Sequence, residues 1–198
     1  YTSRALYLQV SGGGNLFENN LFKSNTDAAI GSNVIFIGNN DLFYHNTFVN
    51  ENPPSGVGAS VVGHGSFVST DDTNAYNNNI FYRKGDTEIY VCDTYVPFNN
   101  YMGNNNLFNY SGSNIYLCGQ FSLSGWKSLV TPNDANSIIA DPLFINANNN
   151  DYRLQSSSPA CNLNGDYVGA YPCSVADTTL PTVSITAPAN NTVASGIV

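Results

Sequence analysis

The most constraining feature of this chain is a motif, Asn followed by Leu, Ile or Thr and then Phe, that occurs four times. Successive Phe residues of the motif are 26, 33 and 27 positions apart, and the copies begin at Asn20, Asn46, Asn79 and Asn106. Short apolar stretches that alternate with period two, such as residues 34–38, follow the copies. A repeat of this length with several short strands predicts a β-solenoid, because helical repeats need apolar residues three and four positions apart.

Stacking of the repeats predicts two ladders. Equivalent residues of adjacent coils would lie about 4.8 Å apart. The four Asn side chains could then hydrogen-bond along the stack, with the four Phe rings stacked inside the core. Asn also tolerates left-handed backbone geometry, which suits the bends between strands. We interpret both ladders as structural, and an exposed Asn row that binds sugar is the alternative.

The composition excludes two kinds of partner. Six Lys and Arg against fourteen Asp and Glu give a net charge of -8, so the basic footprint of a nucleic-acid-binding protein is absent. No apolar run reaches the roughly 18 residues of a membrane span. The chain opens on Tyr1 without an initiator Met, and we expect the natural N-terminus to lie upstream.

Four cysteines predict two disulfides and an oxidising compartment, with buried free thiols as the alternative. EIYVCD and NIYLCG align without gaps, which places Cys92 beside Cys118 in neighbouring coils. Cys161 and Cys173 would then close a local loop. We therefore expect a protein that is secreted or displayed at the cell surface.

The coil pattern fades after Cys118. Residues 121–130 could form a short helix capped by Ser122 or Ser124. Residues 138–173 then contain four short runs, Asp141-Pro142-Leu143-Phe144, Asp151-Tyr152-Arg153-Leu154, Ser158-Pro159-Ala160 and Val168-Gly169-Ala170-Tyr171. These runs resemble the closing segment of bacterial secreted right-handed β-helix proteins of the pectate-lyase-like superfamily.

The resemblance covers roughly residues 5–173 and implies an all-β fold. That fold is a right-handed parallel β-helix of about five coils over residues 1–173. Its capping segment, residues 138–173, wraps the last coil in this family, which meets the need to cover an open sheet edge.

Residues 174–198 resemble the linker and first strand of a bacterial immunoglobulin-like repeat. A complete domain of that kind needs about 100 residues. The extended β tail at 181–198 could instead be donated to the open edge of a neighbouring subunit. Strand donation of this kind would make the chain a subunit of a homo-oligomer or of a fibre.

A polysaccharide lyase is the main catalytic alternative. It needs a base beside a uronate carboxylate and Ca²⁺ or another cation to neutralise that carboxylate. Lys23 and Arg83 are the candidate catalytic cations, expected to face one groove, and the candidate calcium ligands are Asp71, Asp72 and Asp86.

A hydrolase is less well supported. Asn25-Thr26-Asp27 and Gly63-His64-Gly65 resemble two polygalacturonase motifs, but the family's paired Asp between them is represented by Asp41 alone. The Arg-x-Lys motif is missing as well, because Arg83 and Lys84 are adjacent. We therefore interpret Asp27 and His64 as bend or turn residues.

A carbohydrate-binding module is the remaining alternative, because outward aromatic rings would suit sugar rings. Its stacking candidates are Tyr76, Tyr82, Tyr95 and Tyr101. The sequons at Asn109 and Asn190 are candidate glycosylation sites, and we expect Asn109 to be exposed.

Our leading interpretation is a non-catalytic structural or adhesive module of an extracellular surface protein or filament. It requires no cofactor, whereas the lyase would need Ca²⁺ and a polysaccharide partner.

Overall fold

The computed structural model describes residues 6–9, 14–24, 34–37, 40–50, 63–64, 74–84, 89–90, 101–109, 115–116, 120–129 and 134–173. Strands dominate these residues, which confirms the expected all-β class, and α1 (Leu123–Leu129) is the one α-helix among them. No helix in this part of the chain is long and apolar enough to cross a membrane.

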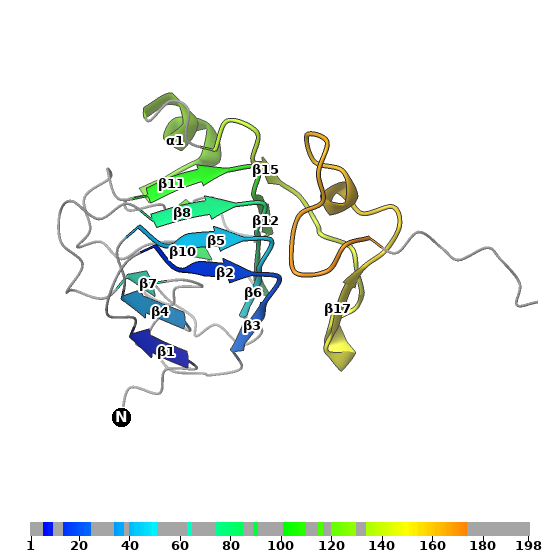
Figure 1. Ribbon diagram of the computed structural model, residues 1–198. Helices are drawn as coiled ribbons and strands as arrows, with labels where there is room; N and C mark the ends of the chain where they lie inside the picture. The colour runs from blue at the N-terminus through cyan, green and yellow to red at the C-terminus, as the bar shows by residue number, and fades with distance from the viewer. Residues whose placement is uncertain are drawn as a thin grey trace, which may run out of the picture.

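Equivalent strands of successive repeats pair in parallel and form two larger sheets (Figure 1). The four-stranded sheet contains, in spatial order, β11 (Tyr101–Asn104), β8 (Asn74–Asn77), β5 (Leu42–Tyr44) and β2 (Leu16–Glu18). The five-stranded sheet contains β15 (Ile138–Ile139), β12 (Leu107–Asn109), β9 (Ile80–Arg83), β6 (Thr47–Asn50) and β3 (Leu21–Ser24). This parallel arrangement is compatible with the expected parallel β-helix.

Two smaller sheets complete the repeats. β1 (Leu6–Gln9), β4 (Val34–Ile37) and β7 (Gly63–His64) are parallel to one another. β10 (Ile89–Tyr90) is parallel to β13 (Ile115–Tyr116), which pairs antiparallel with β14 (Gln120–Phe121). In this small sheet the parallel order therefore ends at β14, where the sequence pattern also fades.

A left-handed residue marks each bend between the two larger sheets. These residues are Asn19, His45, Asn78 and Asn105, with φ of 57°, 53°, 57° and 56°. We name them the bend row. Asn and His adopt this conformation more readily than most residues do, so the sequence preference for Asn at the bends has a backbone cause.

The predicted Asn ladder is confirmed. The backbone N–H and side-chain Nδ2 of Asn20 both donate to Oδ1 of Asn46, at 3.0 and 3.1 Å. Asn46 donates to Asn79 in the same way, and Asn79 to Asn106. Nδ2 of Asn79 also donates to the carbonyl of Phe43 at 3.0 Å. Each buried amide is thus held by neighbours on several sides, which satisfies polar groups that would otherwise be costly to bury.

The Phe rings of the motif form the predicted stack. Ring centroids are 5.1 Å apart from Phe22 to Phe48 and from Phe48 to Phe81, and 5.2 Å apart from Phe81 to Phe108. A second aromatic stack runs through Phe17, Phe43 and Tyr76 in the other large sheet at 4.8 Å spacing, and it was not predicted.

The segment after β14 closes the last repeat. Ser122 caps α1 through a hydrogen bond from the N–H of Gly125 to its Oγ, as expected. Trp126 is fully buried, and its indole N–H donates to Asp134 at 2.9 Å. The N–H of Asp134 in turn donates to the carbonyl of Gly103 in β11. The helix and the turn at residues 134–136 therefore cover the end of the four-stranded sheet.

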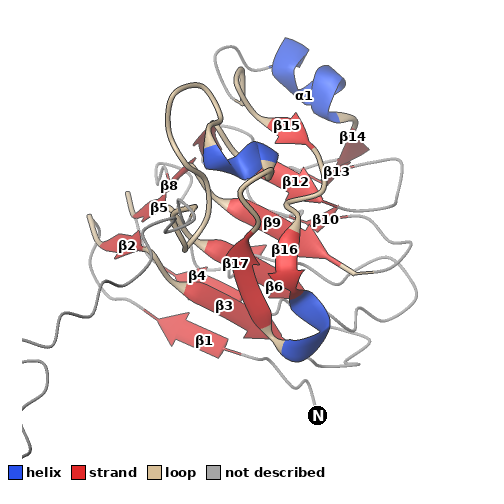
Figure 2. Cartoon of the chain, turned by 90° about the vertical axis from the view of Figure 1, so that its right-hand side faces the viewer, coloured by secondary structure: helices blue, strands red, loops and turns tan. Residues whose placement is uncertain are grey.

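Residues 140–173, which we name the closing segment, lie against the outer face of the five-stranded sheet (Figures 1 and 2). They contain the antiparallel pair β16 (Phe144–Asn146) and β17 (Asp151–Leu154) and two 3-10 turns, η2 (Ala147–Asn149) and η3 (Pro159–Cys161). Val49, Ile80 and Leu107 of the sheet form one apolar cluster with closing-segment residues that include Phe144, Tyr152, Leu154, Ala160 and Val168.

This position differs from the one expected from the resemblance. Residues 138–139 form β15, the last strand of the five-stranded sheet, and the rest of the segment runs back over earlier repeats. It covers an apolar sheet face instead of wrapping the last coil. The reason is physical, since Val49, Ile80 and Leu107 point outward and need cover from water.

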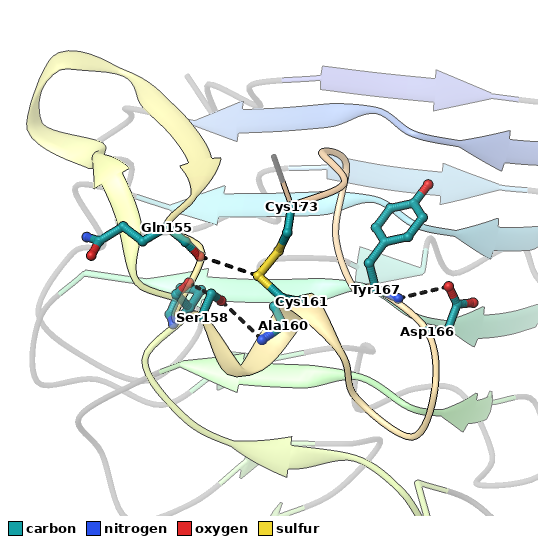
Figure 3. Close-up of a disulfide and its surroundings, with 8 residues drawn as sticks. Gln155, Ser158, Ala160, Cys161, Asp166, Tyr167 and Cys173 are labelled. Carbon is teal, nitrogen blue, oxygen red and sulfur yellow. Dashed lines mark hydrogen bonds between the residues drawn. A yellow bond between two sulfur atoms is a disulfide. The ribbon is translucent and has the colours of Figure 1, made fainter. Parts of the chain in front are cut away.

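The predicted bond between Cys161 and Cys173 is present (Figure 3), with a Cα–Cα distance of 5.3 Å. It closes the loop over the apolar cluster. Cys92, Cys118 and residues 174–198, including the tail, lie outside the described residues.

Candidate functional site

Lys23 and Arg83, the proposed lyase pair, do not face one groove. In the sheet register Lys23 pairs with Val49, and Val49 pairs with Tyr82, whereas Arg83 pairs with Asn50. Successive residues of a strand point to opposite faces. The expectation of a shared groove is therefore wrong.

The surroundings of the two cations agree with this separation. Lys23 lies under the closing segment, where its Nζ donates to Oδ1 of Asn150 and lies 5.5 Å from the ring centre of Tyr152. Arg83 is 1% exposed on the inner side of the same sheet. Lys23 holds the closing segment, and Arg83 is too deeply buried to meet a polymer.

The described carbohydrate-stacking candidates are also covered by other parts of the protein. Tyr76 is fully buried in the aromatic stack, so the prediction that it faces outward is wrong. Tyr82 is partly buried and packs edge-on against Phe144 of the closing segment, at a centroid distance of 5.2 Å. Tyr95 lies outside the described residues, as does the side chain of Tyr101.

No group of three or more His, Cys, Asp or Glu residues that could hold a metal ion occurs in the described ranges. The candidate calcium ligands Asp71, Asp72 and Asp86 lie outside them, as do Asp27 and the side chain of His64. Asp41 is 1% exposed, and its Oδ1 accepts hydrogen bonds from the N–H and Nδ2 of Asn15. Asp41 therefore joins two repeats.

Asn109 is half-buried rather than exposed as expected, and its Nδ2 donates to the carbonyl of Ala140 at 3.1 Å. Glycosylation at this nitrogen would have to break that contact. Asn190 lies outside the described residues.

A groove of about 420 Å³ lies beside α1 and β15. Its lining has one charged group, Lys127, whose Nζ already donates to the carbonyl oxygens of Ala135 and Ser137. The rest of the lining is hydroxyl and apolar, namely Ser122, Leu123, Ser124, Ser137, Ile138 and Ile139. It lacks the carboxylate or imidazole that general acid–base chemistry on a sugar requires.

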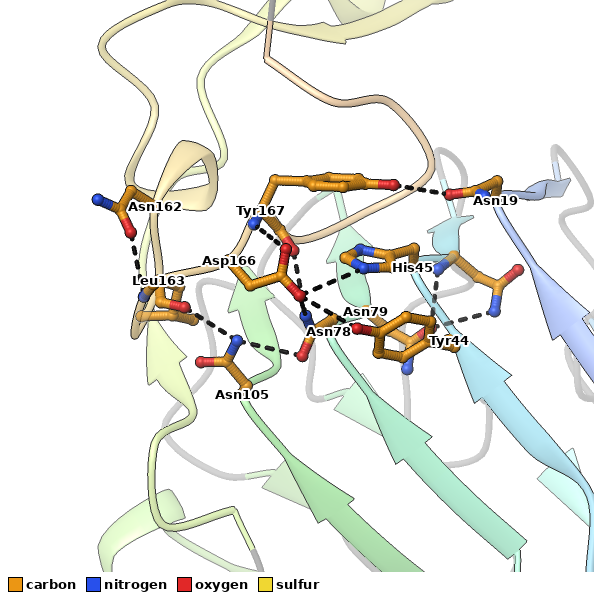
Figure 4. A network of polar contacts seen from close by, with 12 residues as sticks. Asn19, Tyr44, His45, Asn78, Asn79, Asn105, Asn162, Leu163, Asp166 and Tyr167 are labelled. Atoms are coloured by element: carbon orange, nitrogen blue, oxygen red, sulfur yellow. Dashed lines mark hydrogen bonds and ion pairs between the residues drawn. The ribbon is translucent and has the colours of Figure 1, made fainter.

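A polar network lies where residues 162–170, which we name the closing loop, meet the bend row (Figure 4). Oδ2 of Asp166 accepts hydrogen bonds from the hydroxyl of Tyr44 at 3.1 Å and from Nδ2 of Asn78 at 2.7 Å. It also lies 3.5 Å from Nε2 of His45. One carboxylate thus contacts two neighbouring members of the bend row.

The other bend-row members are held by the same loop. The hydroxyl of Tyr167 donates to Oδ1 of Asn19 at 3.1 Å, and Nδ2 of Asn105 donates to the carbonyl of Leu163 at 2.9 Å. One loop therefore contacts all four members of the bend row, from Asn19 at one end to Asn105 at the other (Figure 4).

Gly169 allows the loop to approach this closely. Its N–H donates to the carbonyl of Asn78 at 2.8 Å, and its φ is +97°. A Cβ at this position would lie 2.5 Å from Cδ1 of Ile80 and 2.9 Å from Oγ1 of Thr47. Only glycine fits both the backbone conformation and the space.

Burial shapes the electrostatics of the network. The pKa of His45 is lowered by burial, against the opposing attraction of Asp166 and Glu18. The pKa of Tyr44 is raised by burial and by its hydrogen bond to Asp166. Burial and the negative charges of Asp166 and Glu18 also raise the pKa of Tyr167. At neutral pH the imidazole and the two phenols around the Asp166 carboxylate are therefore uncharged. Uncharged rings favour close packing of the closing loop on the bend row.

Sequence reasoning recognised the run from Val168 to Tyr171 but did not identify the adjacent Asp166 and Tyr167 as contact residues. The available signal was the position of His45, which replaces Asn immediately before the motif Asn and so marks an altered bend.

No protein-family model matches the chain, and neither a curated protein nor a solved structure matches it significantly.

Proposed function

We propose that the chain is a right-handed parallel β-helix of about five coils, of the pectate-lyase-like class. Support comes from the order of strands in two parallel sheets and from ladders that recur once per repeat. The four runs within residues 141–171 remain the sequence basis for the class.

We further propose that it acts as a non-catalytic structural or adhesive module of a secreted surface protein or filament. The observation that carries this proposal is the position of the closing segment. It lies on the outer face of the five-stranded sheet and covers Lys23 and Tyr82, two of the residues that the catalytic and sugar-binding alternatives need at the surface. The recurring polar side chains are engaged in holding repeats together, as the Asn ladder illustrates.

The disulfide between Cys161 and Cys173 supports an oxidising, extracytoplasmic location. The proposed role of residues 181–198 as a donated strand in a homo-oligomer or fibre rests on their sequence. Among the described residues, neither lyase chemistry nor sugar binding gains support from a specific contact, since Lys23 and Arg83 are separated and Tyr76 is buried.

Electron microscopy and light scattering on the full chain and on a variant ending at residue 173 test the filament proposal. Assemblies of the full chain that disappear in the shorter variant are expected. Monodisperse single particles of both would refute assembly through the tail.

Incubation with pectate and alginate in the presence of Ca²⁺ tests the catalytic alternative separately. We expect no rise in the ultraviolet absorbance of unsaturated sugar ends. A rise that is abolished by Lys23→Gln or Arg83→Gln would overturn the non-catalytic assignment.

A further inference from the structure

His45 is the one titratable member of the bend row. The equivalent positions in the other repeats hold Asn19, Asn78 and Asn105, all with nearly the same left-handed φ. Asn would therefore satisfy the bend at position 45. The imidazole adds a proton-binding group at the point where the closing loop docks.

The ring of His45 is enclosed by the loop and by its own strand. It stacks on Tyr167 at a centroid distance of 3.9 Å and meets Tyr44 edge-on at 4.1 Å (Figure 4). His45 is 3% exposed. The titratable groups that act on it are Glu18 from β2, Tyr44 from β5, and Asp166 and Tyr167 from the closing loop.

The two ring nitrogens have different surroundings. Nε2 lies 3.5 Å from Asp166, whereas Nδ1 is buried and has no hydrogen-bond partner among the residues that the structure describes. A neutral ring can direct its single N–H toward Asp166 and leave Nδ1 without a proton. A protonated ring carries a second N–H at Nδ1, and a buried donor without an acceptor costs free energy.

We propose that His45 makes the closing loop an acid-sensitive latch, which stays docked while the imidazole is neutral and detaches from the bend row as the imidazole gains a proton. Detachment gives Nδ1 access to water. It also uncovers part of the outer sheet face around Thr47 and Ile80, against which Gly169 packs.

The direction follows from linkage. Burial lowers the pKa of His45 in the docked state, and Asp166 and Glu18 oppose this lowering without reversing it. The detached state therefore binds more protons than the docked state. The stabilisation of docking by His45 is complete above the ordinary histidine pKa of about 6.5 and is lost as the pH falls through the lowered value.

Hydrogen exchange on the disulfide-intact full chain tests the latch. The reporters are the N–H groups of Gly169 and Ala170, which donate to Asn78 of the bend row and to Thr47 of β6 beneath the loop. Between about pH 8 and about pH 5, where histidine titrates, their protection factors should fall several-fold. The ladder amides of Asn79 and Asn106 should keep theirs. Equal behaviour of the two groups would overturn the proposal.

His45→Asn is the matched variant, because it restores the residue found at the other bends. Its loop should stay protected at both pH values. A loss as large as that of the unmodified protein would assign the effect to another group and overturn the proposal.

A direct titration needs no destabilising variant. The chain has two histidines, so His64→Asn leaves His45 as the one imidazole to follow by NMR. We expect its pKa below that of a histidine in the unfolded chain. A value equal to or above that reference would overturn the proposal, whatever the exchange data show.

Discussion

Nδ2 of Asn106 donates to Oδ1 of Asp134 at 3.1 Å, and this contact ends the ladder that begins at Asn20. Asn46 and Asn79 both accept from the preceding repeat and donate to the next one. An ionised carboxylate only accepts. Asp134 takes hydrogen bonds from Asn106, Ser137 and Trp126, so it satisfies the last rung without requiring another.

Asn79→Ala should lower the free energy of unfolding by about 3 kcal/mol, because it leaves buried partners of a central rung without hydrogen bonds. Asn79 is fully buried and contacts Asn46, Asn106 and Phe43. Asn77→Ala is the control, since Asn77 is half-buried and outside the ladder. Urea denaturation of both variants measures the difference, and similar midpoints would contradict a stabilising ladder.

Gly169→Ala should destabilise the closing segment by about 1–3 kcal/mol through backbone strain and the contact with Ile80. Gly165→Ala is a matched control, because Gly165 also has a positive φ, +90°, but has nothing within 4 Å of a Cβ. The cost at Gly169 should exceed the cost at Gly165. Equal costs in denaturant titrations would argue against close packing of the loop on Ile80.

Removal of the Cys161–Cys173 disulfide by a Cys161→Ala, Cys173→Ala double variant should cost about 2–3 kcal/mol, since the closed loop is short. The two cysteines are 12 positions apart. Mutation is preferable to reduction, because the chain contains four cysteines and the double variant changes only these two. An unchanged denaturation midpoint would show that the bond does not hold the loop in place.

Tyr76→Ala should cost about 3–5 kcal/mol, the usual loss for a fully buried aromatic ring. Tyr76 stacks on Phe43 and is 0% exposed. A tyrosine that stacks on sugars at the surface would be replaced with little change in the denaturation midpoint. Thermal or urea unfolding of this variant therefore separates the two roles directly.

Most of the repeat was predictable, because stacking repeats the same residues at the same places. The spacing of the motif was enough to place Asn20, Asn46, Asn79 and Asn106 in one ladder, and the structure confirms it. The alternation of side chains was harder to use. Lys23 is the first residue after Phe22, whereas Arg83 is the second residue after Phe81. This offset of one residue sends the two side chains to opposite faces of the sheet.

The position of the closing segment could not be predicted from local pattern. Its contacts join residues more than a hundred positions apart, such as Tyr44 and Asp166. Turn residues and short apolar runs indicate that such a segment is compact, but they do not say which face of a sheet it covers. That choice depends on the outward apolar residues Val49, Ile80 and Leu107, which become visible only once the sheet register is known.

The most direct test of the account is an NMR cross-peak between the ring protons of His45 and Tyr167. The two rings are stacked at a centroid distance of 3.9 Å, although the residues are far apart in sequence. If the closing segment lies on the bend row, the full chain at neutral pH should give a strong nuclear Overhauser effect between these rings. Its absence in a folded sample with both residues assigned would contradict the docking on which the structural role depends.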